Sequence, residues 1–230
     1  MEPRPWKERL LFAAAGLLLF GGWFTQCGHR PSMLPLSTSV DGPSPSRAAK
    51  VLLMLHGHGG SSGTTDWIIG ELRKRGVGPD VSVVMVDGPF RAMLHRGWGV
   101  KGEESDESLS RVRALISGWK SANPNLRVYV AGFSRGADVA LHVAANEPMV
   151  SGVCPFASCE PEDVPLLAQR QDLAVTVVHA TNDQLCAFAS GISLVNTLRA
   201  AGHEVTFVEH NENHSIPPAG LDALAKMLAD

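Results

Sequence analysis

A serine between two glycines is the first candidate for chemistry in this sequence, in the stretch Gly-Phe-Ser-Arg-Gly at residues 132–136. β-branched residues precede Ser134 and small, helix-forming residues follow it, so it falls where a buried strand becomes a helix. Flanking side chains would clash in so sharp a turn, whereas glycines relieve the clash and leave the serine hydroxyl exposed. We therefore expect Ser134 to be a nucleophile in a strained conformation.

A serine hydroxyl is a weak nucleophile at neutral pH and needs a base, which in turn needs a carboxylate to orient it. Asp183 and His214 are the candidates, because each lies in a loop just past a Val-rich run that predicts a strand. His210 and His179 compete as the base, although the first lies close to its own strand and the second lies within one. Asp183 could also serve only as a turn former after Asn182.

A loop rich in glycine and histidine, residues 54–63, follows the first predicted strand of the core. Its flexible backbone can direct N–H groups toward the negative charge that develops on an ester oxygen. We expect the amides of His58 and Arg135 to be the two donors of this oxyanion hole, with Gly59 beside the substrate. The alternative is a loop that needs its glycines only for tight turns.

Val-rich apolar runs alternate with helix-like stretches, and such runs are typical of parallel strands buried on both faces. The predicted strands are residues 50–57, 81–88, 126–132, 174–180 and 204–210, with a weaker sixth at 151–157. The predicted helices include residues 64–76, 105–122, 186–202 and 218–230. This order predicts an α/β fold, a doubly wound, mostly parallel sheet with helices on both faces and no large lid. Ligands of such sheets bind at the carboxyl ends of the strands.

Three parts of the chain differ in composition. Residues 1–26 combine basic residues with an uncharged apolar run and predict a signal peptide or membrane anchor, hence an exported or membrane-anchored protein. Cys27 directly follows, as in a bacterial lipoprotein signal, although Gln26 departs from that motif. Residues 27–47 are rich in Pro and Ser and predict a flexible linker, so we assign the folded domain to residues 48–230.

The domain resembles the phospholipase/carboxylesterase branch of the α/β-hydrolases, close to the acyl-protein thioesterases and dienelactone hydrolases. The matching segments are LHGHGG, VDGPFR…RGW, GFSRGA, HATNDQL…LRAAGHEVTF and NHSIPP. The resemblance implies that Ser134, Asp183 and His214 form a catalytic triad, and that His58 and Arg135 supply the oxyanion amides.

Two departures from this branch leave the substrate open. Arg135 stands where the thioesterases usually have Gln, and QLCAF replaces the Pro or Val stretch after the aspartate. The Arg135 side chain either favours an anionic substrate or is simply solvated. Trp98, Phe90 and Met93 are candidate walls of the substrate pocket, unless they only pack beneath a loop.

The residues predict a serine hydrolase that cleaves small carboxylic esters of short to medium acyl chains through an acyl-enzyme. The alternatives are a thioesterase or serine peptidase of the same fold, or a catalytically silent, membrane-tethered binding domain. A net charge of −3 without a basic block argues against a nucleic-acid partner.

No cofactor or metal is expected, because the pairs His56–His58 and His210–His214 lack a third ligand. In an exported domain, Cys154 and Cys159 could form a disulfide, or they remain buried thiols.

Overall fold

The computed structural model describes residues 34–92, 95–99 and 102–230, all within one unit of the chain. The predicted signal or anchor at residues 1–26, the predicted lipidation site Cys27 and the candidate pocket residue Met93 lie outside the described residues. No helix in the described ranges is long and apolar enough to cross a membrane.

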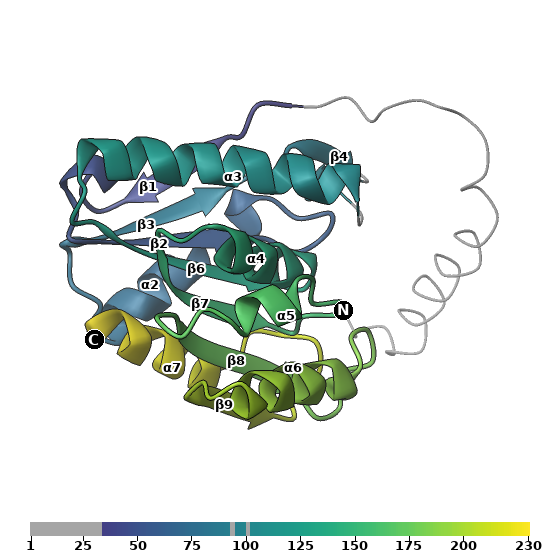
Figure 1. Cartoon of the computed structure of the whole chain (residues 1–230). Helices are drawn as coiled ribbons and strands as arrows, with labels where there is room; N and C mark the ends of the chain where they lie inside the picture. Colours follow the sequence, from purple (N-terminus) through teal and green to yellow (C-terminus); the bar gives the residue numbers. More distant parts are fainter. Residues whose placement is uncertain (1–33, 93–94, 100–101) are drawn as a thin grey trace, which may run out of the picture. The chain divides into compact units, whose positions relative to one another are not determined.

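In the described part of the chain, a seven-stranded sheet has the strand order β1-β3-β2-β6-β7-β8-β9 (Figure 1). Neighbouring strands from β3 through β9 are parallel, and β1 alone is antiparallel to its neighbour. The strands are β1 Thr38–Asp41, β2 Lys50–Leu55, β3 Val81–Val86, β6 Arg127–Phe133, β7 Val150–Phe156, β8 Ala174–Ala180 and β9 Val205–His210. The predicted α/β fold and all six predicted strands are thereby confirmed.

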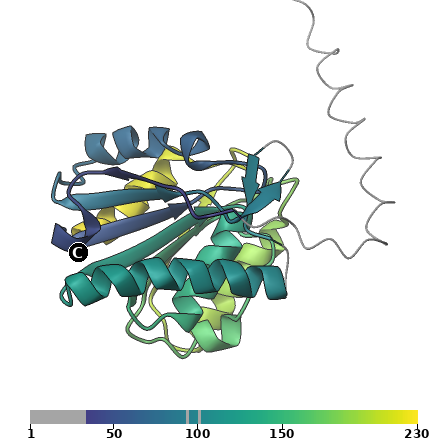
Figure 2. The same ribbon diagram turned by 90° about the horizontal axis from the view of Figure 1, so that it is seen from above.

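Helices cover both faces of the sheet (Figure 2). They are α2 Trp67–Lys74, α3 Glu103–Ala122, α4 Arg135–Asn146, α5 Val164–Leu167, α6 Phe188–Ala200 and α7 Pro218–Ala229, with 3-10 turns η1 Pro45–Arg47 and η2 Ser62–Thr64. Apolar side chains of α3, α4 and α6 share one core, and those of α2 and α7 share the other. A short hairpin of β4 Phe90–Ala92 and β5 His95–Gly97 lies apart from the main sheet. No large lid is evident in the described residues.

The near-continuous apolar runs arise because successive side chains of a strand point to opposite faces. In β2, Leu53 and Leu55 enter the core below α3 and α4, whereas Leu52 and Met54 enter the core below α2 and α7. A central strand of this sheet therefore has no polar face, and its apolar run predicted it well.

The prediction that residues 27–47 form a flexible linker is wrong for the last part of this range. Thr38 pairs with Val86 and Asp41 pairs with Val83, which makes β1 an edge strand on β3. The side chain of Arg73 anchors the end of this strand, with its Nε 3.0 Å from Asp41 Oδ2. An edge strand needs only backbone partners and has mostly exposed side chains, so a polar composition does not exclude one.

A chain that begins at Ala48 lacks β1 and leaves the edge of β3 unpaired. We expect its free energy of unfolding to be about 2–4 kcal/mol lower than that of a chain beginning at Ser32, because the backbone hydrogen bonds of β1 are lost. We also expect stronger self-association through the open edge. Urea unfolding and light scattering of the two chains test this, and equal unfolding midpoints would contradict it.

Candidate active site

Ser134 forms a tight turn between β6 and α4. Its backbone has φ 55° and ψ −124°, a conformation that is costly for any residue other than glycine. The Ser134 amide donates to the Phe156 carbonyl at 2.9 Å, and the Ser134 carbonyl accepts from the Ala137 amide at 2.8 Å. Hydrogen bonds on both sides therefore hold the strained residue in place.

The two flanking glycines are required by close backbone contacts. A Cβ atom on Gly132 would overlap the carbonyl of Gly136, and a Cβ atom on Gly136 would overlap the carbonyls of Leu55 and His56. The start of α4 thus lies directly against the end of β2, and only glycine permits this approach.

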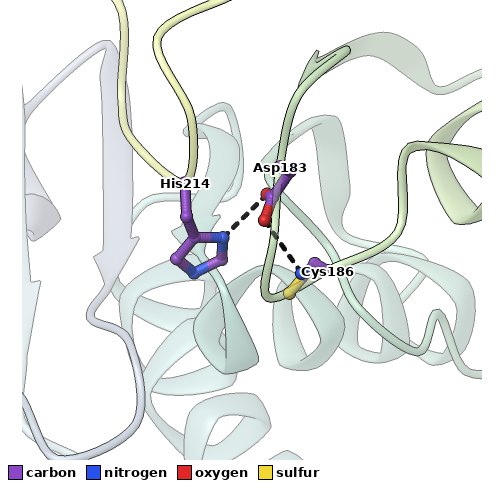
Figure 3. Close-up of side chains that lie close together, drawn as sticks. All are labelled: Asp183, Cys186 and His214. Carbon is purple, nitrogen blue, oxygen red and sulfur yellow. Dashed lines mark hydrogen bonds and ion pairs between the residues drawn. The ribbon is translucent and has the colours of Figure 1, made fainter. Parts of the chain in front are cut away.

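Asp183 and His214 meet in the loops after β8 and β9 (Figure 3). His214 Nδ1 donates to Asp183 Oδ2 at 2.8 Å. Asp183 Oδ1 accepts from the amides of Leu185 and Cys186, at 2.8 and 2.9 Å. Burial would raise the pKa of Asp183, but these hydrogen bonds outweigh it and hold the pKa below its usual value. The carboxylate is therefore charged, and it fixes the imidazole with Nε2 free to accept a proton.

The His214 ring lies beside the serine turn, because it packs against Phe133 with 4.8 Å between the ring centroids. Within the described residues, the side-chain hydrogen bond of His214 goes to Asp183, and none joins its ring to Ser134 Oγ. A proton can pass from Ser134 to His214 only through such a bond, and bonds of this kind often tighten only when substrate is bound.

The competing histidines occupy other places. His179 is fully buried behind Asp183, and its Nε2 donates to the Cys186 carbonyl at 3.0 Å. His210 Nδ1 accepts from the Glu212 amide at 3.3 Å, and burial lowers the pKa of His210. Neither histidine lines a hollow beside Ser134.

The loop after β2 lies beside the serine and is fixed by His56. The His56 Nδ1 donates to the Gly57 carbonyl at 2.7 Å, and its Nε2 accepts from the Gly88 amide at 3.0 Å. Burial lowers the pKa of His56, which agrees with a neutral ring in this arrangement. His58 follows, and then Gly59 with φ 70°, a value that glycine adopts without strain.

Hollows on two sides of His58 adjoin the serine turn. One of about 280 Å³ is lined by His58, Gly99, Ser134, Arg135, Asp138, Cys159 and Glu160. The other, of about 310 Å³, is lined by residues 57–60 with Thr64, Thr65, Trp67, Phe133, Ser215 and Ile216. A larger hollow of about 780 Å³ lies at the amino ends of β8 and β9 and contains none of the predicted site residues.

Arg135 is the first residue of α4, so its amide has no partner within the helix and can donate to a ligand.

Residues 100–230 match the family model described as phospholipase/carboxylesterase. The chain belongs to this family. Solved structures with the same fold include esterase PE8, with 16% identity over 85% of this chain and 99% of that chain and a TM-score of 0.71. The Bacillus cereus carboxylesterase has 18% identity over 84% and 93% of the two chains and a TM-score of 0.66. The Zea mays acyl-protein thioesterase 2 has 20% identity over 84% and 97% and a TM-score of 0.66.

Within this phospholipase/carboxylesterase fold, the prediction that Trp98 lines the substrate pocket is wrong. Trp98 is fully buried, and its indole N–H donates to the His56 carbonyl at 2.8 Å. Phe90 is likewise buried, in β4. Trp98 therefore supports the start of the loop after β2 instead of lining the pocket, and Phe90 is packed inside the protein.

Neither interpretation of the Arg135 side chain is correct. The guanidinium donates to Glu162 Oε1 and to the Gly99 carbonyl, each at 2.9 Å, and the side chain is only 13% exposed. Asp138, buried in the same hollow, lies 3.6 Å from Arg135 Nη1. The charge is therefore neutralised by the protein and is neither solvated nor available to an anionic substrate.

Of the two alternatives for Cys154 and Cys159, the disulfide between them is wrong, and the buried thiol is correct for Cys154 only. Cys159 pairs instead with Cys186, with 4.4 Å between the Cα atoms. Cys154 is a free thiol in the core, and burial raises its pKa. Cys159 and Cys186 follow the carboxyl ends of the neighbouring strands β7 and β8, so the strand order brings them together. This bond joins the wall of the smaller hollow to the loop that carries Asp183.

Among the described residues, one group of three has the composition of a metal site. Asp183, Cys186 and His214 each offer a ligand atom, and these atoms lie within 4.8 Å of one another. In the disulfide form the Cys186 sulfur is already bonded to Cys159, and the other two side chains are hydrogen-bonded to each other.

Gly136→Ala tests the close approach of α4 to β2. We expect it to lower the free energy of unfolding by about 3 kcal/mol, because the new methyl group overlaps backbone that cannot move aside. The matched control is Gly118→Ala in α3, where a Cβ atom has open space and alanine should stabilise the helix by about 0.5–1 kcal/mol. Urea unfolding measures both variants, and equal midpoints would refute this account of the turn.

Removal of the disulfide should destabilise the domain. The bond links residues that are 27 positions apart, and its loss should lower the free energy of unfolding by about 3–4 kcal/mol. The measurement is urea unfolding of the oxidised and reduced protein. As a control, reductant should have no effect on the Cys159→Ser/Cys186→Ser double variant. An unchanged midpoint on reduction of the wild-type protein would show that the bond contributes nothing.

Proposed function

We propose that this protein is a serine hydrolase that cleaves carboxylic esters of short to medium acyl chains through an acyl-enzyme. The observation that carries the proposal is the hydrogen bond between His214 and the charged Asp183, in loops at the same end of the sheet as the strained Ser134. Membership of a hydrolase family supports it.

In the proposed mechanism, His214 Nε2 takes the proton of Ser134 Oγ as the oxygen attacks the ester carbonyl. The amides of His58 and Arg135 donate to the oxyanion of the tetrahedral intermediate. The intermediate collapses with cleavage of the ester C–O bond, and His214 returns the proton to the leaving alcohol. Water then attacks the acyl-enzyme by the same steps, and Asp183 keeps the imidazole in the required tautomer throughout.

The two hollows suit the two halves of an ester. The hollow bordered by Trp67, Phe133 and Ile216 has apolar walls and is proposed to hold the acyl chain. The hollow lined by His58, Ser134 and Cys159 lies on the other side and is proposed to hold the alcohol. Volumes near 300 Å³ favour short or medium chains.

We further propose that the domain acts outside the cytoplasm, exported or anchored through residues 1–26, with Cys27 as the candidate for lipidation. The disulfide between Cys159 and Cys186 supports this proposal, because such bonds persist in oxidising compartments.

Ser134→Ala should lower kcat on p-nitrophenyl butyrate by on the order of a millionfold, because the covalent step is lost. His214→Ala should cost about as much, and adding it to Ser134→Ala should cost little more, since the two residues act as a unit. Asp183→Asn should lower kcat by about 10,000-fold through the wrong imidazole tautomer. The matched control is Ser193→Ala, an exposed serine of α6, which should retain full activity.

Labelling with a fluorophosphonate provides a second readout. The wild-type protein and Ser193→Ala should take the probe, and Ser134→Ala should not. Ordinary activity or labelling of Ser134→Ala would rule out the proposed nucleophile, and an unreactive wild-type protein would favour the silent binding domain.

A further inference from the structure

The side chains that would supply the base and its carboxylate lie next to a sulfur atom. Asp183, Cys186 and His214 bring a carboxylate oxygen, a thiol sulfur and an imidazole nitrogen within 4.8 Å of one another (Figure 3). The sulfur is occupied only because it is bonded to Cys159. A single covalent bond therefore separates this group from a complete set of three metal ligands.

We propose that reduction of the Cys159–Cys186 disulfide opens a Zn²⁺ site formed by Asp183, Cys186 and His214, and that bound Zn²⁺ blocks hydrolysis. The metal site is independent of the enzyme's activity, whereas the block on hydrolysis rests on the proposed function. Oxidised protein is then insensitive to zinc, and reduced protein is inhibited by it.

The donor set suits this ion. Zn²⁺ binds thiolate, imidazole and carboxylate, and three protein ligands with a water in the fourth position are a common arrangement. The Asp183 side chain is fully buried, whereas the His214 side chain is 11% exposed, so an ion would enter from the imidazole side. Tetrahedral ligands at zinc distances lie about 3.3 Å apart, so the 2.8 Å contact between Asp183 and His214 needs to open only slightly.

Groups around the three ligands are already arranged to support them. The amides of Leu185 and Cys186 hold Asp183 Oδ1, which leaves Oδ2 directed at the imidazole. The Nε2–H group of His179 donates to the carbonyl of Cys186 and so fixes the backbone that carries the sulfur. Hydrogen bonds of this kind orient ligands at metal sites and raise their affinity.

The chemistry balances in two steps. A thiol reductant supplies two electrons and two protons, becomes a disulfide itself, and leaves Cys159 and Cys186 as free thiols. Zn²⁺ then displaces one proton from the Cys186 thiol to solvent and binds His214 at Nδ1, whose proton moves to Nε2. With Nε2 protonated and Asp183 bound to the metal, the imidazole can no longer accept the proton of Ser134.

Two single variants provide the decisive comparison. Cys159→Ser and Cys186→Ser remove the same disulfide, but only Cys159→Ser retains the sulfur donor. With Zn²⁺ alone as the probe, titration calorimetry should find one ion per chain on Cys159→Ser without reductant and at least a 100-fold weaker affinity on Cys186→Ser. Co²⁺ should give a thiolate charge-transfer band with Cys159→Ser only. Equal binding to the two variants, or none to either, would overturn the proposal.

The wild-type protein tests the redox step without any substitution. It should bind Zn²⁺ only after treatment with a phosphine reductant, which becomes a phosphine oxide and does not consume the protein's thiols. Zinc binding to the fully oxidised protein at the same affinity would overturn the role of the disulfide. His214→Ala added to Cys159→Ser should weaken zinc binding at least tenfold, and unchanged affinity would remove His214 from the site.

Measurements of ester hydrolysis distinguish a failure of the zinc proposal from a failure of the proposed function. Equimolar Zn²⁺ should lower ester hydrolysis by Cys159→Ser at least tenfold, a chelator should restore it, and Cys186→Ser should be unaffected. Zinc binding to Cys159→Ser without any ester hydrolysis by the wild-type protein would sustain the metal site and refute the proposed function. Zinc binding without inhibition of an active Cys159→Ser would refute the block on hydrolysis.

Discussion

The site depends on the close contact between the first turn of α4 and the end of β2. Gly136 lies against the carbonyls of Leu55 and His56, where no side chain fits. This contact forces Ser134 into its strained conformation and brings the amide at the start of α4 beside the loop that contains His58. The proposed nucleophile and the proposed oxyanion donors are thus positioned by a single packing constraint, which is why the strain can be maintained.

A second, separate set of contacts fixes the other half of the site. Backbone amides after β8 hold Asp183 charged although it is buried, and Asp183 in turn holds His214. The disulfide connects this half to the first, since Cys159 lines the same hollow as Ser134 and Cys186 donates its amide to Asp183. Groups fixed before substrate arrives need little reorganisation during the reaction, which is the main source of electrostatic catalysis.

The central strands and the turn at Ser134 could be predicted from the sequence, because burial on both faces and a glycine-flanked serine leave local patterns. β1 could not, since an edge strand is held by backbone pairing and carries no apolar signal. The Cys159–Cys186 bond was not predicted, because it depends on β7 and β8 being neighbours in the sheet, which the sequence does not show directly. The ion pair between Arg135 and Glu162 could not be predicted either, because no regular spacing in the sequence relates the two residues.

The most direct test of the account is a crystal structure of the protein after reaction with a fluorophosphonate. We predict phosphorus bonded to Ser134 Oγ, its anionic oxygen within hydrogen-bonding distance of the amides of His58 and Arg135, and His214 Nε2 beside the serine oxygen. Modification of another residue, or an adduct on Ser134 whose oxygen faces solvent away from both amides, would contradict the central claim that one packing constraint positions nucleophile and oxyanion hole together.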